Sequence, residues 1–177
     1  IGCAGIFKYA KGLPYLLKAL ALTRQEADIR LELVGEMRDS EIETFNIMLD
    51  TTRTKALIKT LGVLSRESLM EWLMTLDAFV VPSVTEGCPT VLMEAMAVGL
   101  PVIAANTGAV DDLIEDGVSG IIVQKANSGA LADAILTVYR HPDVARSMGE
   151  NARRRMEQFS ADVEFSSWTR VYEGLLG

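Results

Sequence analysis

The sequence has few of the side chains that build metal sites and disulfide frameworks. Its 177 residues include two cysteines, Cys3 and Cys88, and one histidine, His141. A zinc knuckle and a disulfide scaffold both need more of these ligands, so both are excluded. A Cys–His dyad would lack a third group to orient it. A low cysteine content is typical of proteins in a reducing compartment, so we expect a cytoplasmic protein. Membrane association of the full-length protein is left open.

Long apolar runs and an excess of positive charge are also missing. No apolar run approaches the ~20 residues that cross a bilayer, and the start of the chain lacks the basic leader of a signal peptide. The chain has 17 basic and 24 acidic residues, a net charge of −7. An acidic surface repels phosphates, so we expect no nucleic-acid partner. Residue 1 is Ile and opens a strand pattern, so we expect a fragment of a longer protein.

Short apolar runs alternate with longer helical patterns along the chain. Apolar residues make up 49% of the sequence, enough for the core of one domain. We expect one domain over residues 1–177, with an α/β fold: a Rossmann-like doubly wound parallel sheet of about six strands, with helices on both faces. The predicted strands cover residues 1–7, 29–34, 57–64, 78–81, 101–105 and 120–123. The predicted helices cover residues 13–22, 40–52, 90–98, 110–115, 131–140 and 142–158, with two more after Ser65 and Ser160.

Ligands of such sheets bind beyond the carboxyl ends of the strands, so the loops there are the candidate sites. The glycine patterns of dinucleotide-binding folds and of P-loop enzymes are absent, as is the nucleophile elbow of hydrolases. The segment 85–101, TEGCPTVLMEAMAVGLP, remains. Its Gly87 allows close approach of the backbone to a ligand. The first N–H groups of the helix that begins near Pro89–Thr90 attract an anion such as a diphosphate.

Two glutamates in this segment are candidate ligands for hydroxyl groups. The helix around Glu94 is apolar on nearly every side, so we expect a buried carboxylate that needs polar partners. A vicinal diol such as that of a ribose supplies two donors. Glu86 lies at the tip of the loop, within reach of another hydroxylated group. The alternative, that Glu94 accepts from backbone N–H groups and Glu86 caps a helix, is equally compatible with the residues.

Two further loops carry candidates of weaker specificity. Gly5 follows the first strand, and Lys8 and Lys11 are the charges of its loop, placed to approach phosphates. Ordinary solvated lysines are the alternative. The turn at Gly108 leads into Asp111 and Asp112, for which capping of a helix is a sufficient explanation.

Together these residues resemble the C-terminal domain of retaining glycosyltransferases of the GT-B fold, family 4 or group 1. The resemblance rests on Glu86 and Glu94 in EGCPTVLME, on the AMAVGLPVIA that follows, and on the Lys11–Gly12 pair, and it extends over essentially the whole chain. It implies that Glu94 holds ribose hydroxyls, that Glu86 holds a hydroxyl of the donor sugar, and that Lys11 stabilises the leaving diphosphate. The implied catalytic residues are Lys11 and Glu86. The implied donor-binding residues are Gly5, Lys8, Lys11, Val63, Leu64, Glu86, Gly87, Cys88, Pro89, Thr90, Val91 and Glu94.

The resemblance also implies the reaction and the partners. The full-length enzyme would move a sugar, of hexosyl type, from a nucleotide-diphosphate sugar to a sugar, glycan or lipid-linked acceptor. It would do so with retention and with neither metal nor cofactor. The acceptor would sit on an N-terminal domain that this chain lacks, so the chain alone would be inactive. Many members carry arginine where Ile6 stands, and Lys8 is the substitute in the loop. The apolar stripe of the last helix, including Trp168 and Tyr172, would face the missing domain.

Two other functions remain open from the sequence. One is the corresponding half of a GT-B-type nucleotide-sugar epimerase or a phosphorylase, although one histidine and no evident cofactor lysine argue against both. The other is a non-catalytic Rossmann-like interaction module, which an acidic surface and an apolar terminal helix would suit.

Overall fold

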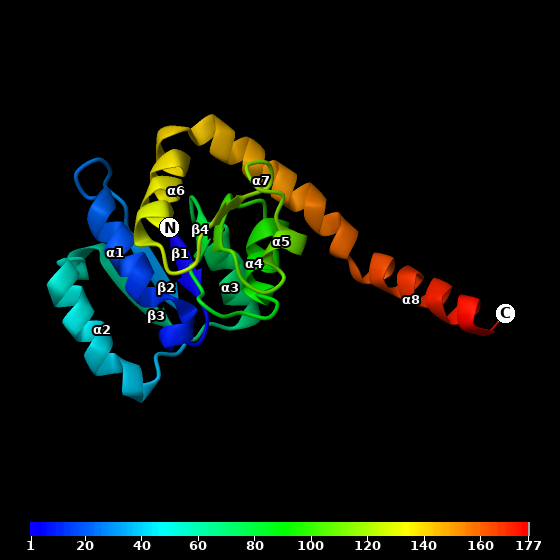
Figure 1. Cartoon of the computed structure of the whole chain (residues 1–177), viewed down its shortest axis with the longest axis horizontal. Helices are drawn as coiled ribbons and strands as arrows, with labels where there is room; N and C mark the ends of the chain where they lie inside the picture. Colours follow the sequence, from blue (N-terminus) through cyan, green and yellow to red (C-terminus); the bar gives the residue numbers. More distant parts are fainter. Residues whose placement is uncertain (177) are drawn as a thin grey trace.

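The computed structural model describes residues 1–176 and has an α/β architecture around one parallel sheet (Figure 1). The spatial order of the strands is β3-β2-β1-β4-β5-β6, and all of their pairings are parallel. This order confirms the predicted doubly wound sheet. The strands are β1 (Gly2–Ala4), β2 (Leu31–Val34), β3 (Ile58–Gly62), β4 (Phe79–Val81), β5 (Val102–Ala105) and β6 (Ile121–Val123).

Helices cover both faces of the sheet, because every strand-to-strand connection crosses over it. The α-helices are α1 (Leu13–Thr23), α2 (Asp39–Thr52), α3 (Arg66–Leu73), α4 (Thr90–Ala97), α5 (Val110–Leu113), α6 (Ser128–Arg140), α7 (Pro142–Met156) and α8 (Ala161–Leu176). Short 3-10 turns lie at η1 (Tyr9–Lys11), η2 (Lys55–Leu57) and η3 (Glu157–Phe159). Residues of α1, α2 and α6 share one apolar cluster, and those of α3, α4, α5 and α7 share the other.

The central strands divide the core between these two clusters. Successive side chains of a strand point to opposite faces. In β4, Val80 belongs to the α1–α6 cluster, whereas Phe79 and Val81 belong to the α3–α4–α7 cluster. All residues of β5 are buried. The fully apolar runs of the sequence therefore correspond to strands that are covered on both sides.

The first strand is shorter than the predicted segment 1–7. The pairing of β1 with β2 ends at Ala4, and Gly5 takes a φ of 141° that turns the chain out of the sheet. Phe7 then forms an isolated bridge with Met37. The chain between residues 5 and 12 is therefore a loop at the carboxyl edge. The helix predicted after Ser65 is confirmed as α3, and Ser65 caps it: its Oγ atom accepts a hydrogen bond from the N–H of Ser68 at 3.2 Å.

The order of the strands locates the functional edge of the sheet. β1 pairs with β2 on one side and with β4 on the other, so the chain reverses its direction of winding between β1 and β4. The loops after these two strands depart toward opposite faces. In folds of this kind, ligands bind in the crevice between two such loops, at the carboxyl ends of the strands. These are the loops that carry Lys11 and Glu86.

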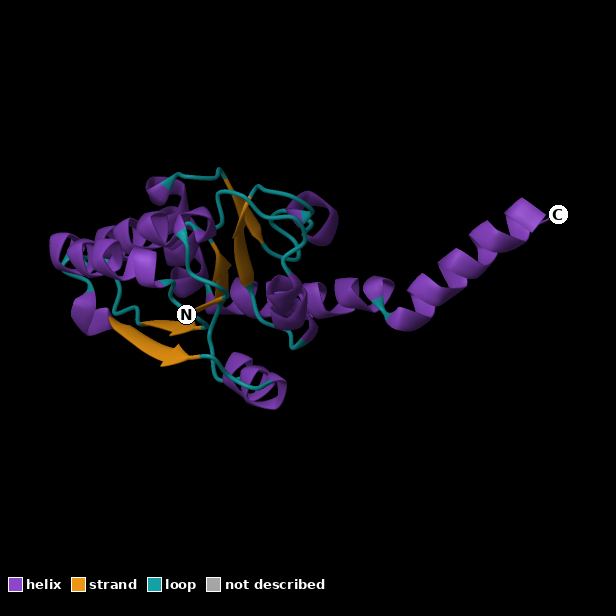
Figure 2. Ribbon diagram, turned by 90° about the horizontal axis from the view of Figure 1, so that it is seen from below, coloured by secondary structure: helices purple, strands orange, loops and turns teal. Residues whose placement is uncertain are grey.

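The last helix leaves this compact body. Figures 1 and 2 show α8 continuing away from the sheet and its covering helices. Its large apolar side chains are exposed, including Phe165 at 76%, Trp168 at 54% and Leu175 at 75%. The predicted apolar stripe is thus present and open to solvent in this chain. Among residues 1–176, no helix combines the length and the apolar character needed to cross a membrane.

Candidate functional site at the switch point

The loops after β1 and β4 are held together at their backbones. A Cβ atom on Gly12 would lie 1.8 Å from the carbonyl oxygen of Pro82, so only glycine fits there. Gly12 also takes a φ of 74°, which other residues rarely adopt. Nearby, the N–H of Val84 donates to the carbonyl of Ala10 at 2.9 Å. The two loops therefore have a fixed relative position before any ligand arrives.

This arrangement brings together the two predicted catalytic residues. The Nζ atom of Lys11 lies 3.1 Å from Oε2 of Glu86, although the two residues are 75 positions apart. Their side chains are 11% and 25% exposed. The ion pair is therefore sheltered, although both side chains keep some exposure to solvent. The fold therefore brings Lys11 and Glu86, predicted from separate segments, into direct contact.

Gly5 provides the space for the side chain of Lys11. A Cβ atom on Gly5 would lie 2.8 Å from Cε of Lys11 and 3.2 Å from Nζ. The lysine stem therefore lies directly over this glycine. A side chain at position 5 would move the ammonium away from Glu86, so Gly5 supports the ion pair; the predicted contact of Gly5 with a donor stays a prediction.

Unpaired backbone donors surround the start of α4. Within residues 1–176, the N–H groups of Gly87, Cys88, Thr90 and Val91 donate to no protein acceptor. Pro89 precedes the helix and has no N–H to offer, and none of the described side chains caps this helix. Free amides at a helix start carry partial positive charge. This segment therefore presents a cluster of donors beside the ammonium of Lys11, as an anion-binding loop requires.

The β4–α4 loop is also supported from the side of β5. A Cβ atom on Gly108 would lie 2.1 Å from the carbonyl oxygen of Gly87 and 2.3 Å from that of Glu86. The N–H of Ala109 donates to the carbonyl of Gly87 at 2.8 Å. The glycine turn noted in the sequence therefore acts by packing on the loop, rather than through Asp111 or Asp112, which are exposed.

Glu94 lies in the second turn of α4, and its exposure differs from the prediction. The side of α4 that faces the core carries Leu92, Ala95 and Met96, whereas Glu94 lies on the flank and is partly exposed. No hydrogen bond to its side chain occurs within residues 1–176. The prediction of a buried carboxylate is wrong in degree, because only one face of this helix is covered. The open flank leaves the carboxylate available to an external donor.

The remaining predicted residues lie on loops of the same edge. Val63 is 75% exposed and Leu64 is partly buried, and both follow β3. The carbonyl of Gly62 accepts from the N–H of Gly35 at 2.7 Å, which ties this loop to the one after β2. Lys8 is exposed and forms no ion pair among the described residues. Lys11 is thus held by an ion pair, whereas Lys8 is not.

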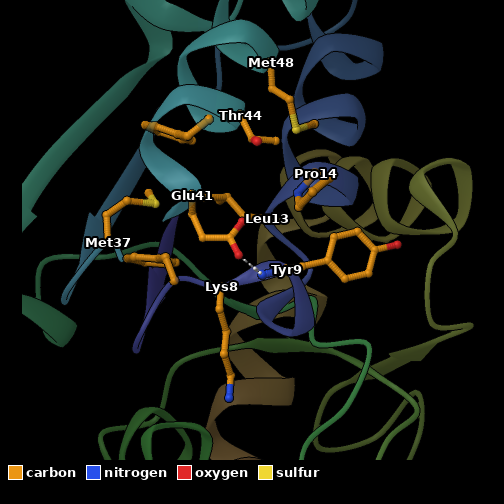
Figure 3. Close-up of a pocket in the computed structure, with 10 residues that line it drawn as sticks. Lys8, Tyr9, Leu13, Pro14, Met37, Glu41, Thr44 and Met48 are labelled. Carbon is orange, nitrogen blue, oxygen red and sulfur yellow. Dashed lines mark hydrogen bonds between the residues drawn. The ribbon is translucent and has the colours of Figure 1, made fainter. Parts of the chain in front are cut away.

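A separate cavity lies between α1 and α2, beside the β1–α1 loop (Figure 3). It has a volume of about 20 Å³, little more than room for a water molecule, and is lined mostly by apolar side chains. The Oε1 atom of Glu41 accepts from the N–H of Tyr9 at 3.3 Å, and the side chain of Lys8 points away from this carboxylate. Neither Lys11 nor Glu86 lines this cavity. The hydrogen bond between Tyr9 and Glu41 therefore ties the β1–α1 loop to α2.

The two cysteines have very different surroundings. Cys3 is fully buried in β1, and its burial raises the pKa of the thiol to about 11, against a smaller opposite effect of Lys11. Cys88 is exposed in the β4–α4 loop, with Sγ 4.0 Å from Sδ of Met93. The only histidine of the sequence, His141, precedes α7 at the opposite edge of the sheet from this site. No Cys–His dyad therefore forms among the described residues.

Comparison with known proteins gives a consistent result. The model of the family described as "Glycosyl transferases group 1" matches residues 1–155. The chain is 29% identical over 171 residues to a D-inositol 3-phosphate glycosyltransferase of Pseudarthrobacter chlorophenolicus, covering 95% of this chain and 39% of that protein. It is similar to sucrose-phosphate synthase of Thermosynechococcus elongatus, with a TM-score of 0.88 and 27% identity over 99% of this chain and 45% of the other.

A third similar protein has been solved with a ligand. HepE of Anabaena in complex with UDP-glucose has a TM-score of 0.83 and 24% identity, over 89% of this chain and 43% of that protein. The chain thus spans less than half the length of each of these three proteins.

Proposed function

The chain belongs to the group 1 glycosyl transferases, and we propose that it is the half of such an enzyme that binds the nucleotide-sugar donor. The observation that carries this proposal is the contact of 3.1 Å between Lys11 and Glu86 at the switch point. This contact supports the proposal because a cation suited to phosphate and a carboxylate suited to sugar hydroxyls meet where the β4–α4 loop offers free amides. The UDP and glucose bound to the similar HepE, at 25% identity, support the same class of ligand.

Each part of the site has a role in this proposal. The diphosphate binds the free N–H groups of Gly87, Cys88, Thr90 and Val91, where the partial positive charge of the helix start is greatest. Glu86 accepts a hydrogen bond from a hydroxyl of the donor sugar. The partly exposed carboxylate of Glu94 accepts from the two ribose hydroxyls, and the loop of Val63 and Leu64 contacts the base.

Lys11 contributes most to the chemical step. When the bond between the sugar and the diphosphate breaks, negative charge grows on the departing phosphate. A preorganised ammonium next to that charge stabilises the transition state more than the ground state. We propose that Lys11 and the backbone amides supply this stabilisation without a metal ion, and that transfer proceeds with retention. Transfer activity that resists a metal chelator is the expected observation, and its loss would contradict the metal-independent part.

The acceptor is proposed to bind outside this chain. A carbohydrate or related hydroxyl compound held by a second domain would approach the donor across the crevice, and positioning of both reactants is a large part of such catalysis. We therefore expect donor binding by this chain and transfer only by the protein at its natural length.

Calorimetric titration tests donor binding. UDP-glucose, GDP-mannose and ADP-glucose, each beside its free nucleoside diphosphate, are titrated into the protein. We expect one of the three series to bind, and Glu94→Ala to weaken that binding about 10- to 100-fold through loss of hydrogen bonds to a charged acceptor. Glu71→Ala, an exposed glutamate on α3, is the matched control and should bind as the wild type does. Absence of binding by every series, even at millimolar concentration, would contradict the proposal.

Product analysis separates the other enzyme classes. An epimerase would change the stereochemistry of the nucleotide sugar without an acceptor, whereas a glycosyltransferase needs an acceptor and releases nucleoside diphosphate. A non-catalytic module would lose only stability when Lys11 or Glu86 is replaced. A stable variant that has lost donor binding would exclude that module.

A further inference from the structure

Ser83 differs from the other buried polar residues of the described chain. Five residues within positions 1–176 are polar and buried: Thr23, Thr54, Ser83, Thr107 and Ser119. The hydroxyls of Thr23, Thr107 and Ser119 bond to main-chain groups, and that of Thr54 bonds to Thr52. Ser83, with an exposure of 0%, donates instead to a carboxylate, that of Glu86, at 3.1 Å.

Two donors converge on one oxygen of that carboxylate. Oγ of Ser83 and Nζ of Lys11 each lie 3.1 Å from Oε2 of Glu86. Within residues 1–176, Oε1 of Glu86 accepts no hydrogen bond. The side chain is therefore held through one oxygen and leaves the other for an outside donor.

The two groups that bond to Glu86 differ in whether their contact persists when donor binds. Lys11 is 11% exposed and has a long, flexible stem, and our proposed function gives its ammonium to the diphosphate when donor binds. Ser83 is short and fully buried. Its backbone is held in place because Gly12 packs against it: a Cβ atom on Gly12 would lie 3.3 Å from the N atom of Ser83. The serine hydroxyl can therefore keep the same contact with Glu86 in the empty and in the occupied site, whereas the lysine has to share its ammonium between Glu86 and the diphosphate.

We infer that Ser83 is a positioning residue that orients Glu86 toward the donor sugar; this inference rests on the proposed function. Its hydroxyl fixes Oε2, so that Oε1 accepts the hydrogen bond of the sugar hydroxyl without first losing rotamer freedom. Ser83 therefore determines how strongly the site distinguishes a nucleotide sugar from the free nucleotide. Under this proposal, its hydroxyl acts on the carboxylate for the sugar and not on the groups proposed to bind the diphosphate and the ribose.

A merely structural role makes a different prediction. If the hydroxyl of Ser83 only satisfied its own burial, its removal would alter stability and would weaken nucleotide and nucleotide sugar to the same extent. A positioning role changes only the sugar-dependent part. The informative quantity is thus the ratio of the Kd of the free nucleoside diphosphate to the Kd of its sugar.

The test uses the protein at its natural length and the nucleotide series that binds the wild type among UDP-glucose, GDP-mannose, ADP-glucose and their free diphosphates. Ser83→Ala should lower the Kd ratio about tenfold or more, with the Kd of the free diphosphate unchanged. Ser83→Thr, which restores a hydroxyl, should recover most of the ratio. Ser119→Ala is the matched control, because Ser119 is also buried, at 2% exposure, but bonds to the main chain of Glu115.

The outcomes separate this inference from the proposed function. If the wild type binds its nucleotide sugar and Ser83→Ala retains the wild-type ratio, the inference is overturned and the proposed function stands. The inference is overturned in the same way if Ser83→Ala weakens both ligands equally. If the wild type binds no nucleotide sugar, the proposed function fails and the inference fails with it.

Discussion

The β4–α4 loop and helix α8 are constructed in opposite ways. The loop is fixed by its neighbours on two sides: Ala10 and Gly12 on one, and Gly108 and Ala109 on the other. Helix α8 projects from the body with its apolar side chains in solvent. Preorganisation of the loop reduces the free-energy cost of binding a small ligand. The apolar stripe of α8 is open to solvent in the described chain, and we propose that it contacts a second domain of a longer protein.

Replacement of Gly12, which holds the β4–α4 loop in place, should have the largest effect on the free energy of unfolding. In Gly12→Ala the new Cβ atom would lie 1.8 Å from the carbonyl oxygen of Pro82, at a φ of 74°. We expect a loss of about 3 kcal/mol or more in the free energy of unfolding, or failure to fold. Chemical denaturation measures it.

Gly117 is the matched control for this substitution. It has a φ of 73° but no atom within 4 Å of its Cβ direction. Gly117→Ala should therefore cost only about 1 kcal/mol, from the backbone conformation alone. Equal losses in the two variants would show that the contact between the loops is unimportant.

Replacement of Lys11 should affect catalysis more than folding. Lys11→Met keeps the stem over Gly5 and removes the ammonium. We expect the transfer rate of the protein at its natural length to fall about 100- to 1,000-fold, since a preorganised charge acts on the transition state. Lys18→Met, on the exposed side of α1, is the control and should retain activity. An active Lys11→Met variant would remove this lysine from the mechanism.

Glu32 should have a smaller effect on the free energy of unfolding, and only at acidic pH. Nε1 of Trp72 donates to Oε2 of Glu32 at 2.7 Å, and this bond holds the pKa of the carboxyl below its ordinary value of 4.5. The folded state thus favours the ionised form, so the stabilisation is present above pH 4.5 and is lost as pH falls through the folded pKa. Unfolding titrations between about pH 3 and 6 should show this decline in the wild type and a weaker one in Glu32→Gln. Identical slopes would contradict the assignment.

The smallest effect is expected in α8. Phe165→Ser and Leu175→Ser, at sites 76% and 75% exposed, should each change the free energy of unfolding of this chain by less than about 1 kcal/mol. Leu92→Ala, in the buried face of α4, is the contrasting control and should cost about 2–5 kcal/mol. A large loss in the α8 variants would mean that the helix already stabilises the body.

Much of the fold follows from patterns in the sequence. The apolar runs around Val80 and Ile103 identify strands covered on both faces, and the serine at position 65 marks the start of α3 as predicted. Strand ends are less predictable: β1 stops at Ala4 because of the backbone at Gly5, although Ile6 and Phe7 continue the apolar pattern. The pattern reports burial, and Phe7 is buried outside the sheet.

The sequence predicts which residues belong to the candidate site, but it does not predict which of them contact one another. The sequence indicates Lys11 and Glu86 separately, and their pairing depends on the fold that places two distant loops together. Ser83 gives no signal, because a serine after a strand is common in loops. The sequence overstates the burial of Glu94, since the apolar residues around it do not reveal which flank of α4 is open.

The extended residue Ser160, with a ψ of 154°, interrupts the helical backbone between η3 and α8. The 16 residues of α8 form a rod roughly 24 Å long beyond that break. A rotation of about 10° at Ser160 would therefore displace the far end by roughly 4 Å. A small change of one backbone dihedral angle at Ser160 therefore produces a large displacement of the C-terminal end of α8 relative to the sheet, and with it of any group that contacts that end.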